Sequence, residues 1–597
     1  MKLWDRSLRA YATFASLMVM LIGTSVSAQE PTKWDLRLND PIYLSWLGYD
    51  KIGECVECHL SPPIKLSGNK DGFGTLSRRV EMEKWLTMDK HTIARRRVEP
   101  FDSATALKQI DVIAPKWDAQ RAELKAQLTE ADIKFNPNNN SLVKGVQESW
   151  VGASNVLSRR ICDKLWGNGS VTKKEGYDKF RENCLTCHGG YQGNPSGFEF
   201  DQVANAQLGI DCNFCHQLGE NNAWVEVHDV QEKWRMKTPA EKEAAGLRNL
   251  VDTGNQATLC MDCHVGNRSK NMFVTHQMYA AGHPPLPSIE LEEFCKEMPQ
   301  HWQTPSQLYE SLAGFKDRDR YFAINYPGLG GVKADGVFWN TRKMLVGALT
   351  ARKKSLELLI DSADAHRWAD YSLYDCAACH HELQSQSVRQ FRGFPAAPGR
   401  PRQHEWPDAV LQIAYAYVFH KNPTSKSSMQ GLEAQLTAAI GEQPFGDQNR
   451  VRPIAEQLRG RLDLAIAEME NKPVTANIAK AVLVGLSRAP EQRIFTYDSA
   501  RQVIWAMQTI VREMKQKGAP IDAQVSTIVM ALGDESTAGV AAKIPSGRKQ
   551  FIFPTSLEAD LNRRANFSPS RLKTQLNRIN QLLSASLNQK RSNLVSK

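Results

Sequence analysis

The chain has 597 residues, 42% of them hydrophobic, and a formal net charge of +10. This length and composition are ordinary for a globular protein of two or more domains. No segment after the N-terminal region is long and apolar enough to span a membrane, and the excess of positive charge is modest. Composition therefore gives no case for a membrane-spanning or a nucleic-acid-binding protein.

The N-terminus has the pattern of a secretory signal. Lys2, Arg6 and Arg9 form a basic start, an apolar run extends from Tyr11 to about residue 23, and the small-residue sequence SVSA precedes Gln29. The apolar run is shorter than the roughly 20 residues that an uncleaved membrane anchor needs. We therefore expect residues 1–28 to be a signal peptide and the mature chain to be exported to the periplasm or an equivalent extracytoplasmic space.

Five copies of a C-x-x-C-H motif follow, at residues 55–59, 184–188, 212–216, 260–264 and 376–380. Chance would produce far fewer than one copy in a chain with 12 Cys and 14 His. Two thiols at this spacing add to the two vinyl groups of a porphyrin, and the next residue supplies the iron with its proximal imidazole. The motifs therefore predict five covalently bound haem c groups. The attaching cysteines are Cys55, Cys58, Cys184, Cys187, Cys212, Cys215, Cys260, Cys263, Cys376 and Cys379, and the proximal histidines are His59, His188, His216, His264 and His380.

Zinc is the alternative cofactor for such a pattern. C-x-x-C pairs also build zinc sites, and the spacing from Cys184 to Cys212 would suit a four-cysteine zinc ribbon. A zinc ribbon does not require a histidine directly after its second cysteine, whereas covalent haem attachment does. The histidine in all five copies therefore favours haem. Export agrees with this interpretation, because c-type haem is attached outside the cytoplasmic membrane.

Haem attachment changes the charge balance of the molecule. Removal of the signal lowers the charge of the chain to about +8, and the propionates of five haems contribute up to about −10. The holoprotein should therefore be close to neutral, which removes any argument from the pI for nucleic acid as a partner, and no nucleic-acid partner is expected. Lys and Arg are expected in part as propionate contacts. The expected partners are redox proteins.

Cysteine and histidine divide the chain into two parts. All 12 Cys lie before residue 380 and 12 of the 14 His before residue 382, which predicts a pentahaem cytochrome c domain over residues 29–405. Regular structure there should be sparse and mostly helical, because porphyrins replace side chains as core filler, with a charged helical insertion over about 101–135. A Pro- and Gly-rich stretch at residues 392–407 marks the expected junction.

The second part, residues 406–597, has the period of amphipathic helices. Apolar residues recur three and four positions apart over 454–469, 503–514 and 572–583. This pattern predicts an all-α C-terminal domain. The expected fold class is therefore mainly α: a multihaem cytochrome c with little β structure, followed by a helical C-terminal domain.

Each iron has a second axial position, for which nine further histidines compete. His276 and His283 lie seven residues apart shortly after the fourth motif. His91 follows the first motif near Trp85, and His228 lies between the third and fourth motifs. Another directly follows His380; neighbours on a helix point about 100° apart, so it could bind only an adjacent iron. The candidate distal ligands are, in that order, His276, His283, His91, His228 and His381.

Four histidines have competing interpretations. His301 could be a distal ligand, an active-site residue or a propionate contact. His366, His404 and His420 have the settings of ordinary helix or linker histidines.

Two cysteines, Cys162 and Cys295, lie outside every motif. A disulfide between them would be stable in an oxidising compartment, and two buried free thiols are the simpler alternative. A thiolate axial ligand is a third interpretation.

The runs GIDCNFCH, WRMKTPAEKEAAGLRNL leading into CMDCHVGN, and THQMYAAGHPPLPSIE resemble the multihaem cytochrome c-552/4 family. That family is typified by the tetrahaem electron carrier that serves hydroxylamine oxidoreductase in ammonia oxidisers. The ending YDCAACHHEL resembles larger pentahaem relatives with a helical C-terminal part. The resemblance implies distal-ligand roles for His91, His276 and His283, and haems packed in close stacked pairs. It covers residues from about 45 to about 405, and the fifth motif and the long C-terminal part depart from the type.

The expected function is electron transfer by an exported pentahaem c-type cytochrome, with the C-terminal helices as a candidate docking part. The alternative is a multihaem oxidoreductase in which one iron lacks a distal ligand and acts on a small nitrogen or sulfur compound. A lysine-ligated catalytic haem, which pentahaem nitrite reductases have, is not expected, because all five motifs end in His.

Overall fold

The computed structural model describes His59, residues 81, 84–85 and 89–100, residues 153–190, 209–363, 368–380 and 397–532 with short internal gaps, and residues 567–595. The signal pattern at 1–28, Cys55, Cys58 and the expected insertion at 101–135 lie outside these residues. Throughout the described ranges the chain is mainly α-helical and has no strand, only isolated β-bridges such as the one between Gln217 and Leu247. This secondary structure confirms the expected mainly α fold class with little β structure.

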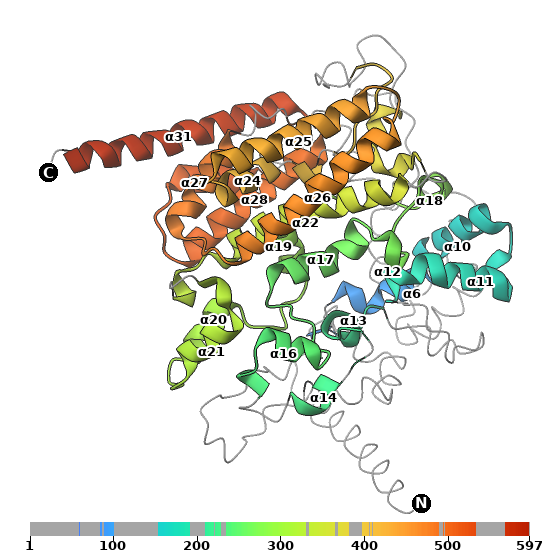
Figure 1. The fold of residues 1–597 in the computed structure, drawn as a ribbon, viewed down its shortest axis with the longest axis horizontal. Coiled ribbons are helices and arrows are strands. Elements are labelled where there is room, and N and C mark those ends of the chain that lie inside the picture. The colour runs from blue at the N-terminus through green and yellow to red at the C-terminus, as the bar shows by residue number, and fades with distance from the viewer. Residues whose placement is uncertain are drawn as a thin grey trace, which may run out of the picture.

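The half of the molecule before α22 (Trp339–Ser362), which we call the motif-bearing half, consists of short helices joined by loops, drawn from blue to yellow-green in Figure 1. The fifth motif lies after α22. The first helices of this half are η1 (Lys90–Ile93), α6 (Ala94–Val98), α10 (Ala153–Trp166), η2 (Ser170–Thr172), α11 (Lys174–Phe180), the π-helical turn η3 (Arg181–Leu185), α12 (Thr186–His188), α13 (Cys212–His216), α14 (Ala223–Val227) and α16 (Pro239–Ala244). They are followed by α17 (Thr253–His264), η5 (Arg268–Lys270), α18 (His276–Ala281), α19 (Leu291–Glu297), α20 (Pro305–Ser311), α21 (Arg318–Asn325), η6 (Pro327–Leu329) and η7 (Ala334–Gly336).

Long helices make up the other half, a bundle that lies along one side of the motif-bearing half (Figure 1). It comprises α22 (Trp339–Ser362), α24 (Leu411–Val418), α25 (Pro423–Gly441), α26 (Gln448–Glu470), α27 (Ala476–Ser487), α28 (Tyr497–Gln516), α29 (Ala523–Ala531) and α31 (Pro569–Val595). Between α22 and α24 the chain forms η8 (Tyr371–Leu373), η9 (Cys376–Ala378) and η10 (Trp406–Asp408). The helices α26, α28 and α31 contain the three segments for which the sequence predicts helices.

Side-chain caps fix where several of these helices begin. Asp252 accepts a hydrogen bond from the backbone of Asn255 at the start of α17, and Asp447 and Asp522 cap α26 and α29 in the same way. Thr238 and Glu241 form a reciprocal capping box at α16. These caps satisfy backbone N–H groups that have no partner inside the helix.

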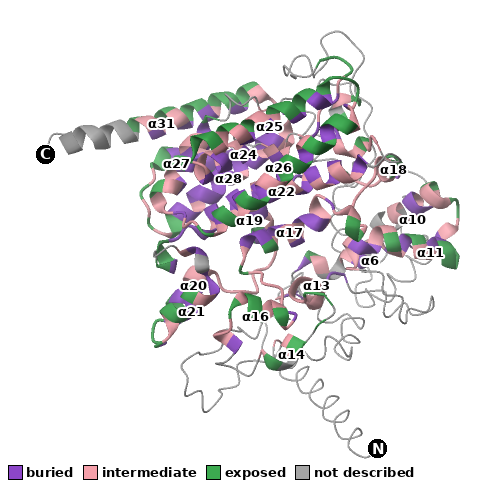
Figure 2. Ribbon diagram, viewed as in Figure 1, coloured by how far each residue is buried: buried purple, intermediate pink, exposed green. Residues whose placement is uncertain are grey.

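One hydrophobic core spans both sides of the expected junction at residue 405. Residues of α22, including Leu345 and Leu356, pack in the same cluster as Leu411 of α24, Leu458 of α26 and Met507 of α28. Figure 2 shows buried residues on the faces where α22, α26 and α28 meet. The expected boundary is therefore not a boundary of packing, because α22, which lies between the fourth and fifth motifs, is a central helix of the bundle.

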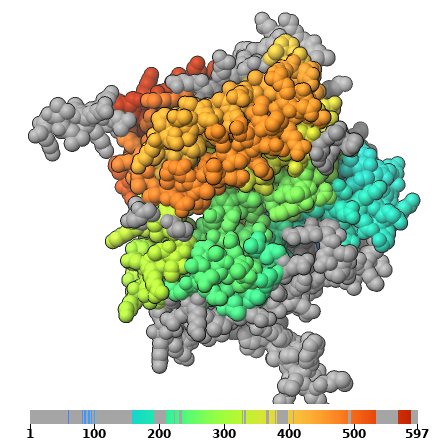
Figure 3. Space-filling model, viewed as in Figure 1, coloured from blue at the N-terminus to red at the C-terminus, as the bar shows by residue number. Residues whose placement is uncertain are grey.

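Helix α22 joins the two halves of the molecule. On its other side it contacts α17, which ends in the fourth motif, and α19. At its N-terminus the carboxylate of Glu513 accepts hydrogen bonds from the backbone N–H groups of Asn340 (2.9 Å) and Thr341 (2.8 Å). Figure 3 shows the surface of the bundle adjoining that of the motif-bearing half. The bundle thus supports the motif-bearing helices directly.

None of the helices in the described ranges has both the length and the apolar character needed to cross a lipid bilayer.

Replacement of Leu458 by Ala should destabilise the bundle. Leu458 has 0% exposure in the core cluster, and such a truncation leaves a cavity that costs about 2–5 kcal/mol of unfolding free energy. Guanidinium unfolding followed by circular dichroism measures the change. Leu464→Ala is the matched control on the same helix, because Leu464 is 71% exposed and its truncation should stay within about 0.5 kcal/mol. Equal effects of the two substitutions would contradict the described core.

Candidate functional site

Three of the motifs that the structure describes lie at the ends of helices, and a fourth lies at the beginning of one. His188 ends α12, His216 ends α13 and His264 ends α17, while the fifth motif begins in η9. Residues three positions apart share one face of a helix, so the two cysteines of each helical motif lie on the same side. Asp211 caps α13 by accepting a hydrogen bond from the backbone of Phe214 at 2.7 Å. A helical turn therefore presents both thiols and the following imidazole together.

Every motif histidine faces one further histidine. The ring centroids are 6.4 Å apart for His59 and His228, 6.5 Å for His188 and His283, 6.3 Å for His216 and His301, 6.3 Å for His264 and His91, and 6.3 Å for His380 and His276. Four of the five opposed histidines are among the candidate distal ligands of the sequence analysis, and the fifth is His301. We call these five arrangements the histidine pairs.

The spacing within the pairs fits one metal ion between two imidazoles. A bond from a metal to an imidazole nitrogen is about 2.0–2.1 Å, and the nitrogen lies about 1.1 Å from the centre of its ring, so two rings on opposite sides of one ion have centroids about 6.3 Å apart. The five observed separations are all 6.3–6.5 Å. In the four motifs whose cysteines the structure describes, the paired thiols and the two imidazoles are the residues that would hold a haem c.

Hydrogen bonds on one ring nitrogen support the same assignment. In four of the pairs the Nδ1 atom of one or both histidines has a protein acceptor, which leaves Nε2 as the nitrogen that can bind iron. The acceptors are Glu81 for His59 (3.3 Å), Asp89 for His91 (2.9 Å), the Val225 carbonyl for His228 (2.8 Å), the Pro284 carbonyl for His283 (2.7 Å) and the Pro299 carbonyl for His301 (3.3 Å).

Five histidines of the pairs are partly buried, and burial favours the neutral form of imidazole that binds metals. Burial lowers the pKa of His188, of His216 and of His264 to about 4. Burial also lowers the pKa of His283 and of His301, an effect partly offset in each by a backbone hydrogen bond. Burial therefore favours the neutral form of these five imidazoles.

Aromatic side chains pack against the histidine pairs. Phe294 lies edge-on to His264 at 5.2 Å, Trp302 edge-on to His301 at 5.0 Å, and Trp224 lies 5.2 Å from His228. Tyr371 packs edge-on to His276 at 5.5 Å, and Tyr279 lies 6.0 Å from His283. These contacts restrict the orientation of each imidazole and surround the pairs with apolar surface.

The other histidines of interest have different surroundings. His404 uses its Nε2 atom in a hydrogen bond with the Ser372 carbonyl (3.1 Å), and the exposed His420 stacks on Tyr417. His366 and His381 lie outside the described residues. The sequence favoured His381 as a ligand to an adjacent iron, whereas the histidines that face the five motif histidines are His228, His283, His301, His91 and His276.

The cysteines outside the motifs are buried free thiols. Cys162 packs in one apolar cluster with Cys184, and Cys295 packs in another with Cys260. No disulfide joins Cys162 to Cys295, which corrects the disulfide alternative in favour of free thiols. Each of these thiols lies beside the first cysteine of a motif.

No zinc ribbon forms in the described part of the chain. Within that part, no three His, Cys, Asp or Glu side chains are grouped as a bare metal site would require. The thiols of Cys187 and Cys263 are neighbours, and their interaction lowers the pKa of Cys187 and raises that of Cys263, so the second and fourth motifs meet at their second cysteines.

Electrostatic interactions between neighbouring pairs, together with the short chain segment from His276 to His283, link the five pairs in a row. His216 lies close enough to His59 and His228 for their charges to interact. Asp89 interacts with both His91 and His301, and His188 interacts with His264. His276 begins the short helix α18 and His283 lies two residues after its last residue, Ala281. The order of the pairs along this row is therefore His59/His228, His216/His301, His264/His91, His188/His283 and His380/His276.

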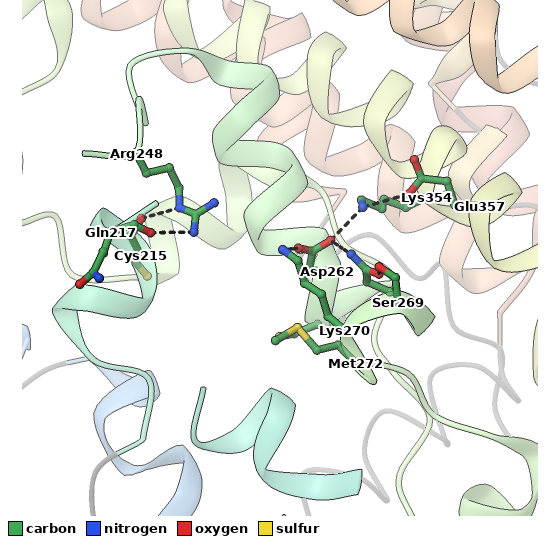
Figure 4. Close-up of polar contacts among 11 residues, drawn as sticks. Cys215, Gln217, Arg248, Asp262, Ser269, Lys270, Met272, Lys354 and Glu357 are labelled. Atoms are coloured by element: carbon green, nitrogen blue, oxygen red, sulfur yellow. Dashed lines mark hydrogen bonds and ion pairs between the residues drawn. The ribbon is translucent and has the colours of Figure 1, made fainter. Parts of the chain in front are cut away.

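Polar contacts fix the third and fourth motifs, as Figure 4 shows. Arg248 donates hydrogen bonds to the Cys215 carbonyl (3.0 Å) and the Gln217 carbonyl (2.9 Å). Asp262, between the two cysteines of the fourth motif, pairs with Lys270 (2.6 Å) and with Lys354 of α22 (2.8 Å). Burial acts to raise the pKa of Asp262, but the two ammonium groups outweigh it and the pKa lies below its ordinary value. The bundle thus holds the fourth motif through a buried ion pair.

The sequence favoured His381 over His301 as a distal ligand. The fold places His301 opposite His216. The one sequence signal for His301 is the adjacent Trp302, which packs against its ring. The sequence also did not indicate two carboxylates that contact histidine rings. Glu81 accepts a hydrogen bond from the motif histidine His59, and Asp89 accepts one from His91.

Residues 164–217 match a family model described as cytochrome c554 and c-prime. The matched segment contains the second and third motifs. No curated protein and no solved structure matches the chain significantly. The matched segment is therefore similar to a cytochrome c family, in agreement with the motif spacing and the histidine pairs found there.

Proposed function

We propose that this chain is an exported pentahaem c-type cytochrome that carries electrons. The observation that carries the proposal is the set of five histidine pairs, each with a motif histidine on one side and centroids 6.3–6.5 Å apart. The motif cysteines would attach each haem, and the two histidines would bind its iron. Haem c bound in this way supplies an iron centre that accepts and returns a single electron.

The arrangement of the protein favours a carrier over the oxidoreductase alternative. An enzyme that acts on a small nitrogen or sulfur compound needs an iron with one open axial position. In each of the five pairs, an imidazole occupies the place opposite the motif histidine. These histidines would leave no iron with an open axial position.

The row of pairs gives the proposed carrier two ends. At one end, Cys376, Cys379 and His380 of the fifth motif are exposed, and Tyr371, which packs against His276, is 52% exposed. At the other end lies the pair of His59 and His228. The three pairs between them contain the histidines whose pKa values burial lowers most. Redox partner proteins would therefore exchange electrons at the first and fifth motifs.

The purified protein should carry its haem through denaturation. Five thioether-linked haems of roughly 0.6 kDa each should raise the mass about 3 kDa above that of the mature polypeptide. Intact-protein mass spectrometry and haem staining of a denaturing gel check this number. A mass equal to that of the bare chain would contradict covalent attachment.

The oxidised protein should give only low-spin ferric signals in electron paramagnetic resonance, because each iron would have two strong-field imidazoles. The angle between the two rings also affects the signal. The planes are within 22° of parallel for His59/His228 and His380/His276, but 75° and 88° apart for His216/His301 and His264/His91. We therefore expect rhombic signals from the two near-parallel pairs and signals of larger maximum g value from the two near-perpendicular pairs. A high-spin signal equal to one haem would instead favour the oxidoreductase alternative.

The substitution His301→Ala should change one haem only. It removes the imidazole opposite His216, so one of five low-spin signals should be replaced by a high-spin signal, with the haem content unchanged. His420→Ala is the matched control, because His420 is exposed and stacks on Tyr417. A spectrum of His301→Ala identical to that of the control would remove His301 from the ligands.

A further inference from the structure

Asp89 makes a distinctive contact with one histidine of the row. It is 3% exposed and lies directly before η1. Its Oδ1 atom accepts a hydrogen bond from the backbone N–H of His91 (2.9 Å) and lies 2.9 Å from Nδ1 of the same residue. Two N–H groups of one residue thus converge on a single carboxylate oxygen, which holds the ring of His91 in a fixed orientation opposite His264.

The other opposed histidines with an Nδ1 hydrogen bond in the described structure use neutral acceptors. His228, His283 and His301 each have a backbone carbonyl at Nδ1. Glu81 is the acceptor for His59, but at 3.3 Å the contact is longer than that of Asp89. Asp89 therefore provides the closest carboxylate contact among these hydrogen bonds.

A carboxylate at Nδ1 changes how well the imidazole donates electrons. The full negative charge draws the Nδ1 proton toward itself and makes the ring a stronger base at Nε2. A stronger axial donor stabilises ferric over ferrous iron, and hydrogen bonding around the ligands is one of the ways in which a protein sets the potential of its haem. A carbonyl at the same position has a weaker effect because it carries no net charge.

The position of Asp89 extends its influence to a second site. Its charge interacts with His301 and with the thiol of Cys215, both of which belong to the third haem site. Asp89 therefore lies where the third and fourth sites adjoin, in the middle of the row of pairs. Buried in a low-dielectric interior, its charge acts on both sites with little screening.

We propose that Asp89 is a positioning residue that lowers the reduction potential of the His264/His91 haem, and to a smaller extent that of the His216/His301 haem. This inference rests on the proposed function, because it requires iron between these histidines. The reduction potential of the haem in the middle of the row would then depend on one buried carboxylate.

Asp89→Asn tests this role, because the amide oxygen can still accept both N–H groups of His91 while the charge is lost. Potentiometric titration of the holoprotein, followed by the visible absorption of reduced haem, resolves the components. We expect one component to shift to higher potential, a second to shift less in the same direction, and the other three to keep their potentials. Electron paramagnetic resonance should still show five low-spin haems.

The matched control is Asp522→Asn, which makes the same change at a carboxylate that accepts two backbone N–H groups at the start of α29. It should leave all five components in place. Asp89→Ser is a second variant that removes the charge and retains a side-chain acceptor for the His91 backbone. It should shift the same component upward.

The outcomes separate the two proposals. Superimposable titrations of the Asp89 variants and the wild type, with five low-spin haems, would overturn the role of Asp89 and leave the proposed function standing. Loss of low-spin character in one haem of both Asp89 variants would also overturn it, because Asp89 would then hold His91 in place without tuning it. Fewer than five low-spin haems in the wild type would instead contradict the proposed function.

Discussion

The structure depends most on the distance across each histidine pair. Two imidazole rings from distant parts of the chain must be held with centroids 6.3–6.5 Å apart, five times over. Freely rotating histidine side chains would not keep this spacing, so other contacts must hold the rings in place. Hydrogen bonds at Nδ1 set the ring orientation, as at His283 and the Pro284 carbonyl, and aromatic contacts such as Phe294 with His264 limit its movement.

The helical bundle contributes to this precision through α22. That helix is buried in the core of the bundle on one side and packs against α17 on the other. Lys354 of α22 pairs with the buried Asp262 of the fourth motif, so removal of either partner would weaken the link between the bundle and this motif. The bundle is therefore a scaffold for the motif-bearing helices, in addition to any part it has in binding other proteins.

The sequence predicted those features that depend on local chemistry. The C-x-x-C-H spacing identified five motif histidines, and the 3.6-residue period predicted the helices that contain Leu458, Met507 and Leu576. The distal positions depend on which loops the fold brings together. His381 was a reasonable candidate from its place beside His380, whereas His301 faces His216 across 85 residues of chain, and nothing local indicates that approach.

The limits of the C-terminal domain illustrate the same difference. The last cysteine and the Pro-rich stretch at 392–407 mark where the motifs end, and the sequence places a boundary there. Packing follows apolar surface, however, and the buried residues of α22, such as Leu345 and Leu349, belong with those of α24 and α26. The presence of cysteine and histidine indicates where a cofactor is attached and does not indicate which helices share a core.

Anomalous X-ray scattering at the iron edge, from crystals of the oxidised holoprotein, tests the central claim most directly. The account predicts five iron peaks, each between the two imidazoles of one histidine pair, in the order His59/His228, His216/His301, His264/His91, His188/His283 and His380/His276. Fewer than five peaks, or a peak with an imidazole on one side only, would contradict it.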